Sequence, residues 1–290
     1  VQTCALPIFY RDIVDRDGDF ALKKNLHRGL GDWRPGADPM DLAASIQQVT
    51  ERELEKLWRK PREYIPAGQI AVSRYGNKRN LVYGGGVALN CVANTRLADL
   101  GLFDNIWIMP NPGDAGSSIG CVAAAERKHI NWRNPFLGHC IEGEYPVDAI
   151  IKELEINRMV GVASGRAEFG PRALGNRSLL ADPRGSNIKD LVNQIKQRQE
   201  FRPFAPAILE EDLYEYFEVP KCVVNTPYMQ FIGICKHGKD FPAIIHHDGT
   251  SRVQTVSKTD NPNFYQLLKT WKDKTGCPML LNTSLNKIGR

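Results

Sequence analysis

Apolar positions in the first third of the chain recur with the period of an amphipathic helix. The side chains Leu42, Ile46, Val49, Leu54 and Leu57 are three to five residues apart. Asp38 followed by Pro39 is a typical helix start, because proline fits the first helical turn. We therefore predict a helix from about Pro39 to about Lys60.

Two similar units follow, each made of a short apolar strand, a glycine-rich loop and a helix. In the first unit, a strand at Asn80–Tyr83 precedes three glycines and a helical pattern that ends at Gly101. In the second, a strand at Asn105–Met109 precedes a helix from about Ala115 to about Ile130. Such units are typical of α/β folds with parallel strands.

Beyond a non-periodic stretch at Asn131–Pro146, strands and helices alternate in an α+β pattern that predicts a mixed sheet. The predicted helices are Val147–Leu154, Asn187–Gln199, Glu210–Tyr216 and Asn263–Thr275, and the predicted strands are Met159–Ala163, Met229–Cys235, Ala243–His246 and Met279–Leu281. We place the domain boundary in the non-periodic stretch, which gives domains at 1–135 and 136–290.

Composition narrows the class of protein. The 290 residues carry a net charge of only +5 without long runs of like charge, so we expect neither nucleic acid nor membrane as a partner. Seven scattered cysteines without a CxxC pair favour reduced thiols and a cytoplasmic location. The chain opens with valine rather than methionine, and we expect a fragment. Oligomeric state is open, and a homodimer is one possibility.

The glycine turns are candidate ligand contacts. Gly84, Gly85 and Asn90 follow the first strand, where small residues and helix amides suit a phosphate or ribose hydroxyls. A tight turn without any ligand is the alternative. Asp114 follows the second strand between glycines, so it can ligate a hard cation, or equally cap the next helix.

The segment from Gly165 to Pro206 concentrates cations on a backbone fixed by glycine and proline. It holds Arg166, Arg172, Arg177, Arg184, Lys196, Arg198 and Arg202. Guanidinium forks match phosphate oxygens two at a time, so this set predicts a site for a phosphorylated small molecule. Solvated surface charge is the alternative for any single arginine.

Six motifs in order resemble one family. They are GGGVALN, NPGDAGSSIG, EFGPRALGNRSLLADPR, KQRQEFRPFAP, HHDGTSRVQTV and MLLNTSLN. Together they are similar to the carbamoyltransferases of the NodU/CmcH type over roughly Asn80 to Asn286. The resemblance implies the C-terminal part of an actin-like ATPase or sugar-kinase-type domain, followed by a YrdC-like α+β domain.

The same resemblance implies an activity and residue roles. The YrdC-like domain would form carbamoyl adenylate from carbamoyl phosphate and ATP, and the first domain would transfer the carbamoyl group to a hydroxyl of a small molecule such as a sugar or antibiotic. Lys196 and Arg202 match residues that grip carbamoyl phosphate, with Arg172 and Arg198 in support. Four further residues match groups that orient carbamate and the adenylate: Arg252, Asn282, Ser284 and Asn286.

The resemblance also implies a divalent metal of the Fe²⁺ or Mg²⁺ type beside the nucleotide, held by Asp114. The histidine pair expected with it is absent before Gly84, where His27 forms no HxxxH motif, so the predicted metal site is incomplete. Two other functions stay open. One is a threonylcarbamoyl adenylate enzyme of tRNA modification, and the other is a fragment that binds nucleotide without turnover.

Overall fold

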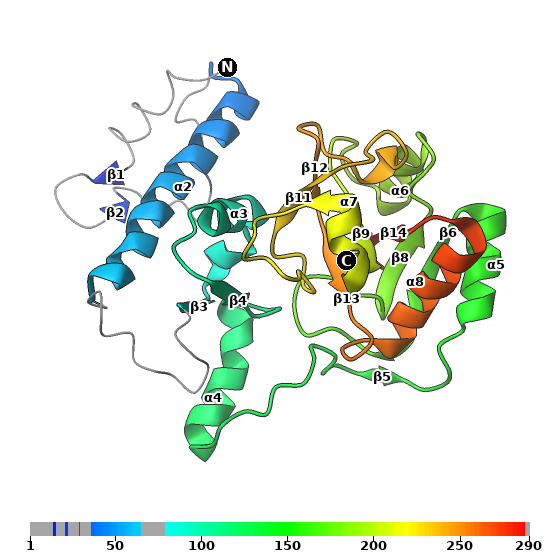
Figure 1. The fold of residues 1–290 in the computed structure, drawn as a ribbon, viewed down its shortest axis with the longest axis horizontal. Coiled ribbons are helices and arrows are strands. Elements are labelled where there is room, and N and C mark those ends of the chain that lie inside the picture. Colours follow the sequence, from blue (N-terminus) through cyan, green and yellow to red (C-terminus); the bar gives the residue numbers. More distant parts are fainter. Residues whose placement is uncertain (1–13, 16–20, 23–28, 30–35, 65–78, 288–290) are drawn as a thin grey trace. The chain divides into compact units, whose positions relative to one another are not determined.

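The computed structural model describes residues 14–15, 21–22, 29, 36–64 and 79–287 (Figure 1). The chain divides into two compact units: Val1–Arg79 with Leu100–Leu102, and Asn80–Asp99 with Phe103–Arg290. Among the described helices, none has both the length and the apolar character that a membrane span requires.

The first unit holds the predicted long helix. This helix, α2, spans Pro39–Tyr64 and begins at the predicted proline, and it buries Val49 and Trp58. Asp38 accepts a hydrogen bond from the Met40 N–H at 2.8 Å, which satisfies one of the free amides of the first turn. Strands β1 (Val14–Asp15) and β2 (Ala21–Leu22) pair antiparallel.

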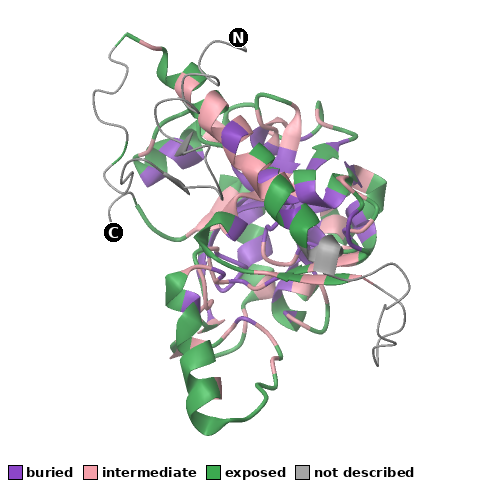
Figure 2. Cartoon of the chain, turned by 90° about the vertical axis from the view of Figure 1, so that its left-hand side faces the viewer, coloured by how far each residue is buried: buried purple, intermediate pink, exposed green. Residues whose placement is uncertain are grey.

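The second unit begins with the two predicted strand–loop–helix repeats. The elements are β3 (Asn80–Tyr83), the 3₁₀ helix η1 (Gly86–Leu89), α3 (Cys91–Asp99), β4 (Asn105–Ile108), η2 (Asp114–Gly116) and α4 (Ser117–Glu126). Strands β3 and β4 pair in parallel, as the repeats imply. Helix α4 ends at Glu126, four residues before the predicted end, because Arg127 takes the left-handed conformation. It has no buried residue (Figure 2).

A five-stranded mixed sheet forms the core of the C-terminal part, with strand order β13-β9-β14-β8-β6. Only β13 and β9 run parallel, and the other neighbours are antiparallel. The strands are β6 (Met159–Ala163), β8 (Arg177–Ala181), β9 (Ala205–Leu209), β13 (Gln254–Val256) and β14 (Met279–Ser284). The predicted mixed α/β architecture is confirmed.

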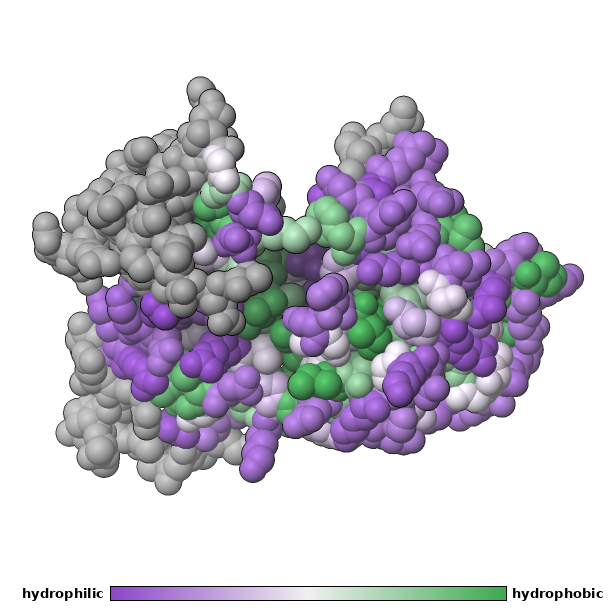
Figure 3. All heavy atoms as spheres, turned by 90° about the horizontal axis from the view of Figure 1, so that it is seen from above, coloured by the Kyte–Doolittle hydropathy of each residue, from purple (hydrophilic) through white to green (hydrophobic). Residues whose placement is uncertain are grey.

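Helices α5 (Val147–Asn157) and α8 (Pro262–Thr275) lie side by side against this sheet (Figure 1). Buried residues of α8, such as Phe264 and Trp271, belong to the hydrophobic core. Hydrophilic side chains cover much of the surface over the C-terminal elements, on the right of Figure 3. The smaller elements are β5 (Cys140–Ile141), β7 (Gly165–Arg166), α6 (Ile188–Lys196), η3 (Glu210–Asp212), α7 (Leu213–Tyr216), β10 (Phe217–Glu218), β11 (Ile232–Cys235), η4 (Pro242–Ile244) and β12 (Thr250–Arg252).

One predicted strand is wrong. Residues Ala243–His246 do not pair in a sheet. Pro242 instead begins the 3₁₀ turn η4, since proline lacks the N–H that a ladder needs. The buried residues Ala243 and Ile244 gave this segment the apolar look of a strand.

Candidate functional site

The two glycine loops lie at the same edge of the β3–β4 pair. Tyr83 and Ile108 are register partners at the ends of the parallel strands, and the Gly85 N–H donates to the Pro112 carbonyl at 2.7 Å. Gly85 has a φ of 97°, which disfavours any residue with a Cβ. The structure therefore brings the predicted nucleotide turns together.

Asn90 and Asp114 have different local roles. The Asn90 side chain accepts the Ala93 N–H at 3.1 Å and so caps α3. Asp114 is exposed as the first residue of η2, which has Gly113 as N-cap and no side-chain cap, so the capping alternative for Asp114 is wrong. Within the described parts of the chain, no three metal-ligating side chains gather. The described residues thus do not fit a complete metal centre.

A pocket of about 460 Å³ lies beside η2 and α4. It is mostly apolar and includes Trp107, Met109, Ile119 and Trp132. No charged side chain lines it, so this pocket is not the predicted anion site.

The predicted cations Lys196 and Arg198 sit at the end of α6. Lys196 is buried, and its ammonium donates to both the backbone and the side-chain oxygens of Ser284 and Asn286, at 2.5 to 3.2 Å. Burial and the neighbouring Arg198 lower the pKa of Lys196 to about 8. The structure therefore joins two motifs that are almost ninety residues apart in the sequence.

Arg202 and Arg252 lie close enough to Arg198 to affect its guanidinium electrostatically. Burial, and then the charges of Arg202 and Arg252, lower the pKa of Arg198 to about 10. Arg198 is fixed by a hydrogen bond from its Nε to Asn193 at 2.6 Å and by stacking on the Phe204 ring. Arg202 is exposed.

Arg172 belongs to the same cluster. Burial, followed by the charge of Arg252, lowers its pKa to about 10, and burial also lowers the pKa of Arg252. The Nε atoms of both are buried without a hydrogen-bond partner, and among the described residues neither guanidinium pairs with a carboxylate. We name Arg172, Arg198, Arg202 and Arg252 the arginine cluster.

Sequence reasoning did not single out Cys91 as a neighbour of this cluster. The thiol stands directly after Asn90, and burial raises its pKa while Arg252 and Arg172 oppose that shift. The predicted nucleotide turn and the arginine cluster therefore approach each other through the first residue of α3. No local sequence signal points to this contact, because its partners lie more than eighty residues away.

Arg177, another cation of the segment, has a structural role. The Arg177 guanidinium donates to four carbonyl oxygens, at Ser164, Asn176, His139 and Gly165, at 2.7 to 3.0 Å. Arg166 is exposed in β7, and its carbonyl accepts from the Asn176 side chain. These contacts hold the loop from Gly165 to Arg177.

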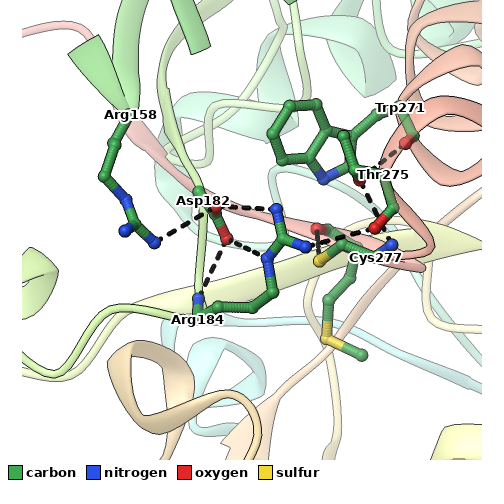
Figure 4. Close-up of polar contacts among 7 residues, drawn as sticks. Arg158, Asp182, Arg184, Trp271, Thr275 and Cys277 are labelled. Carbon is green, nitrogen blue, oxygen red and sulfur yellow. Dashed lines mark hydrogen bonds and ion pairs between the residues drawn. The ribbon is translucent and has the colours of Figure 1, made fainter. Parts of the chain in front are cut away.

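Arg184 is also structural (Figure 4). It donates through Nε and Nη2 to the buried Asp182 carboxylate at 2.9 Å and lies over the Trp271 ring. Arg158 pairs with the same carboxylate at 3.2 Å. Burial alone would raise the pKa of Asp182, but hydrogen bonds from Arg184 and the charges of both arginines outweigh it and hold that pKa below its ordinary value.

Asn282 differs from its neighbours in the NTSLN motif. It is buried in β14, and its amide donates to the Ala173 carbonyl at 3.0 Å and to the Gln254 side chain at 2.6 Å. Asn282 therefore supports the loop that carries Arg172.

Comparison with known proteins identifies the family of this chain. Residues 18–124 match the family profile described as the carbamoyltransferase N-terminus, and residues 151–290 match the carbamoyltransferase C-terminus. The chain belongs to the carbamoyltransferase family. The resemblance in the six motifs is thereby confirmed.

This carbamoyltransferase chain is similar to several curated proteins along most of its length. It is 35% identical to nodulation protein NolO of Bradyrhizobium diazoefficiens, over 96% of this chain and 54% of that protein. It is 38% identical to nodulation protein NolNO of Sinorhizobium fredii, over 96% and 43%. It is 31% identical to the 3'-hydroxymethylcephem-O-carbamoyltransferase of Amycolatopsis lactamdurans, over 96% and 54%. The chain thus spans about half the length of these relatives.

Proposed function

We propose that this chain is part of an ATP-dependent O-carbamoyltransferase that binds carbamoyl phosphate at the arginine cluster. One observation carries the proposal. The guanidiniums of Arg172 and Arg252 are desolvated beside each other without a described carboxylate partner. Bringing two positive charges together in a desolvated site costs free energy, and the attraction of a bound anion offsets that cost.

The chemistry of carbamoyl phosphate suits this cluster. Negative charge accumulates on the phosphate oxygens as phosphate leaves, and fixed cations stabilise that charge without reorganising. Lys196 adds a positive charge held in place by Ser284 and Asn286. In this proposal the carbamoyl group then passes through carbamoyl adenylate to a hydroxyl of a small-molecule acceptor.

The domain roles, the ATP site and the metal remain part of the proposal. Residues 1–135 would be the actin-like or sugar-kinase-type part, residues 136–290 the YrdC-like part, and Gly84, Gly85 and Asn90 would contact nucleotide. A divalent metal at Asp114 would need ligands from outside the described residues, and the proposed chemistry does not depend on it.

The described cysteines are all unpaired, which supports a cytoplasmic location.

A relative supports the proposed acceptor class. The Amycolatopsis protein is named for O-carbamoylation of a hydroxymethylcephem, and we extend hydroxyl carbamoylation to this chain. The alternative, a tRNA-modifying enzyme, would favour a basic nucleic-acid face, and the net charge of +5 supplies little of it.

Phosphate release from carbamoyl phosphate, measured with and without ATP, tests the proposal. We expect ATP-stimulated release that Arg252→Ala abolishes, while Lys152→Ala on the exposed face of α5 behaves as wild type. Binding of carbamoyl phosphate without release would favour the non-catalytic fragment. Transfer of labelled carbamoyl to tRNA rather than to a sugar hydroxyl would favour the tRNA-modifying alternative.

A further inference from the structure

The loop that follows Arg172 has nearly all of its backbone polar groups bonded to fixed partners. Side chains of Asn282, Gln254 and Tyr145 donate to the carbonyls of Ala173, Leu174 and Gly175, and the Ser178 hydroxyl accepts from the Gly175 N–H. Most of these partners come from distant parts of the chain. The loop is therefore held in one conformation by the surrounding fold.

Glu168 accepts several hydrogen bonds from the loop backbone through a single carboxylate oxygen. Its Oε1 atom accepts three backbone N–H groups, from Leu174 at 2.8 Å, Asn176 at 3.0 Å and Arg177 at 3.2 Å. Hydrogen bonds to a charged acceptor are stronger than those between neutral groups. Glu168 forms no ion pair with the arginines of the described chain. Its carboxylate therefore accepts from backbone N–H groups and does not neutralise the positive charge of the arginine cluster.

Two glycines, one on either side of Arg172, allow the backbone conformation of this segment. Gly170 and Gly175 have φ values of 138° and 121°, which residues with a Cβ rarely adopt. A Cβ on Gly175 would also lie 2.5 Å from the ring of Phe264. The backbone at Gly175 thus packs directly against α8.

Arg172 depends on this frame for its position. Its Nε is buried without a hydrogen-bond partner, and no carboxylate among the described residues holds its guanidinium. The contacts that fix Arg198, through Asn193 and Phe204, have no counterpart at Arg172. Among the described residues, the fixed backbone of the loop is therefore the contact network that places the start of the Arg172 side chain.

We propose that Glu168 is a positioning residue that sets Arg172 for binding the phosphate group of carbamoyl phosphate. This inference rests on the proposed function. Its physical basis is that Glu168 anchors the backbone amides of Leu174, Asn176 and Arg177, two to five residues after Arg172. A cation that is already in place loses no conformational freedom when the anion binds, so the loss of Glu168 weakens binding without removing any charge that contacts the ligand.

A double-mutant cycle on the whole chain tests this. We would measure the dissociation constant of phosphonoacetamide, a stable analogue of carbamoyl phosphate, by calorimetry for wild type, Glu168→Ala, Arg172→Ala and the double variant. We expect at least tenfold weaker binding for each single variant and no further loss in the double variant. Glu168→Gln, which keeps an accepting oxygen without the charge, should fall between wild type and Glu168→Ala.

The results distinguish the role of Glu168 from the proposed binding of carbamoyl phosphate at Arg172. Additive losses in the double variant would show that Glu168 does not act through Arg172, and would overturn the inference alone. Unchanged binding for Arg172→Ala would contradict the proposed site and the inference with it. Glu155→Ala, which removes an exposed carboxylate on α5, is the control and should bind as wild type. If Glu168→Ala does not fold, the double-mutant cycle is measured with Glu168→Gln in its place, and additive losses there would overturn the inference.

Discussion

The Lys196 ammonium donates to the Asn286 carbonyl at 2.8 Å, although the two residues are ninety positions apart. The same ammonium binds Ser284, and the Ser284 hydroxyl donates to the Asn286 side chain. One cation thus orders the end of β14 beside the arginine cluster. Lys196 acts in this structure as a cross-link as much as a ligand for anions.

Replacement of Lys196 should therefore change stability as well as binding. Lys196→Met keeps the apolar stem but removes the donor to the half-buried Ser284 and the exposed Asn286, where water replaces part of the contact, so we expect the free energy of unfolding to fall by about 1 kcal/mol. Urea unfolding measures this, and Lys152→Met on the exposed face of α5 is the matched control. Unchanged stability would mean that Lys196 is held only weakly by the NTSLN motif.

Arg198 and Arg202 should differ from each other. Arg202→Ala removes an exposed charge of the cluster, so carbamoyl phosphate should bind more weakly while the free energy of unfolding changes by less than about 0.5 kcal/mol. Arg198→Ala also breaks the bond to Asn193 and the stacking on Phe204, and should lower both binding and stability. Calorimetry with phosphonoacetamide and urea unfolding separate the two effects. Equal loss of stability in both variants would contradict this division of roles.

Anion binding should weaken as the pH rises through about 8. The pKa of Lys196 is lowered to about 8, so its charge is present below that pH and is lost above it. If the lost attraction is about 1 kcal/mol, the dissociation constant for sulfate, which stays a dianion over this range, rises about fivefold between pH 7 and 9. Lys196→Met should have weaker binding that no longer changes over this range. A wild-type profile that is flat to pH 9 would show that the ammonium keeps its proton.

The sequence was sufficient for elements with strong local signals. Helix α8 begins at Pro262 and is followed by Gly276 in the left-handed conformation, and β3 and β4 precede glycine turns. Strand β9 was not predicted, because it is buried on both faces and contains Pro206, so it shows neither alternation nor a typical strand composition.

The candidate site shows the same limit. The sequence identifies the segment that carries the cations but not which of them have partners. Arg177 is held by carbonyls up to 38 residues away, and Lys196 by a motif 88 to 90 residues away. Roles of this kind depend on tertiary contacts, and a single sequence contains no local signal for them.

The buried Asp182 should make stability depend on acid pH. Its carboxylate accepts from the backbone and guanidinium of Arg184 and from Arg158, and these contacts lower its pKa in the folded protein (Figure 4). A lowered carboxyl pKa stabilises the fold above the ordinary aspartate value near 4, and this contribution is lost as the pH falls through the lower folded pKa.

Asp182→Asn should therefore lower the free energy of unfolding by about 2 kcal/mol at pH 7. The loss is no larger because the arginines are partly exposed and water replaces some of the lost contacts. The difference from wild type should shrink below about pH 4, where the carboxyl of the unfolded chain takes up a proton while that of the folded protein still resists it. Asp273→Asn is the control, because the exposed pair with Lys269 contributes less than about 1 kcal/mol. Urea unfolding from pH 3 to 7 measures both variants. A difference that stays constant down to pH 3 would show that charge on Asp182 is not what stabilises this cluster.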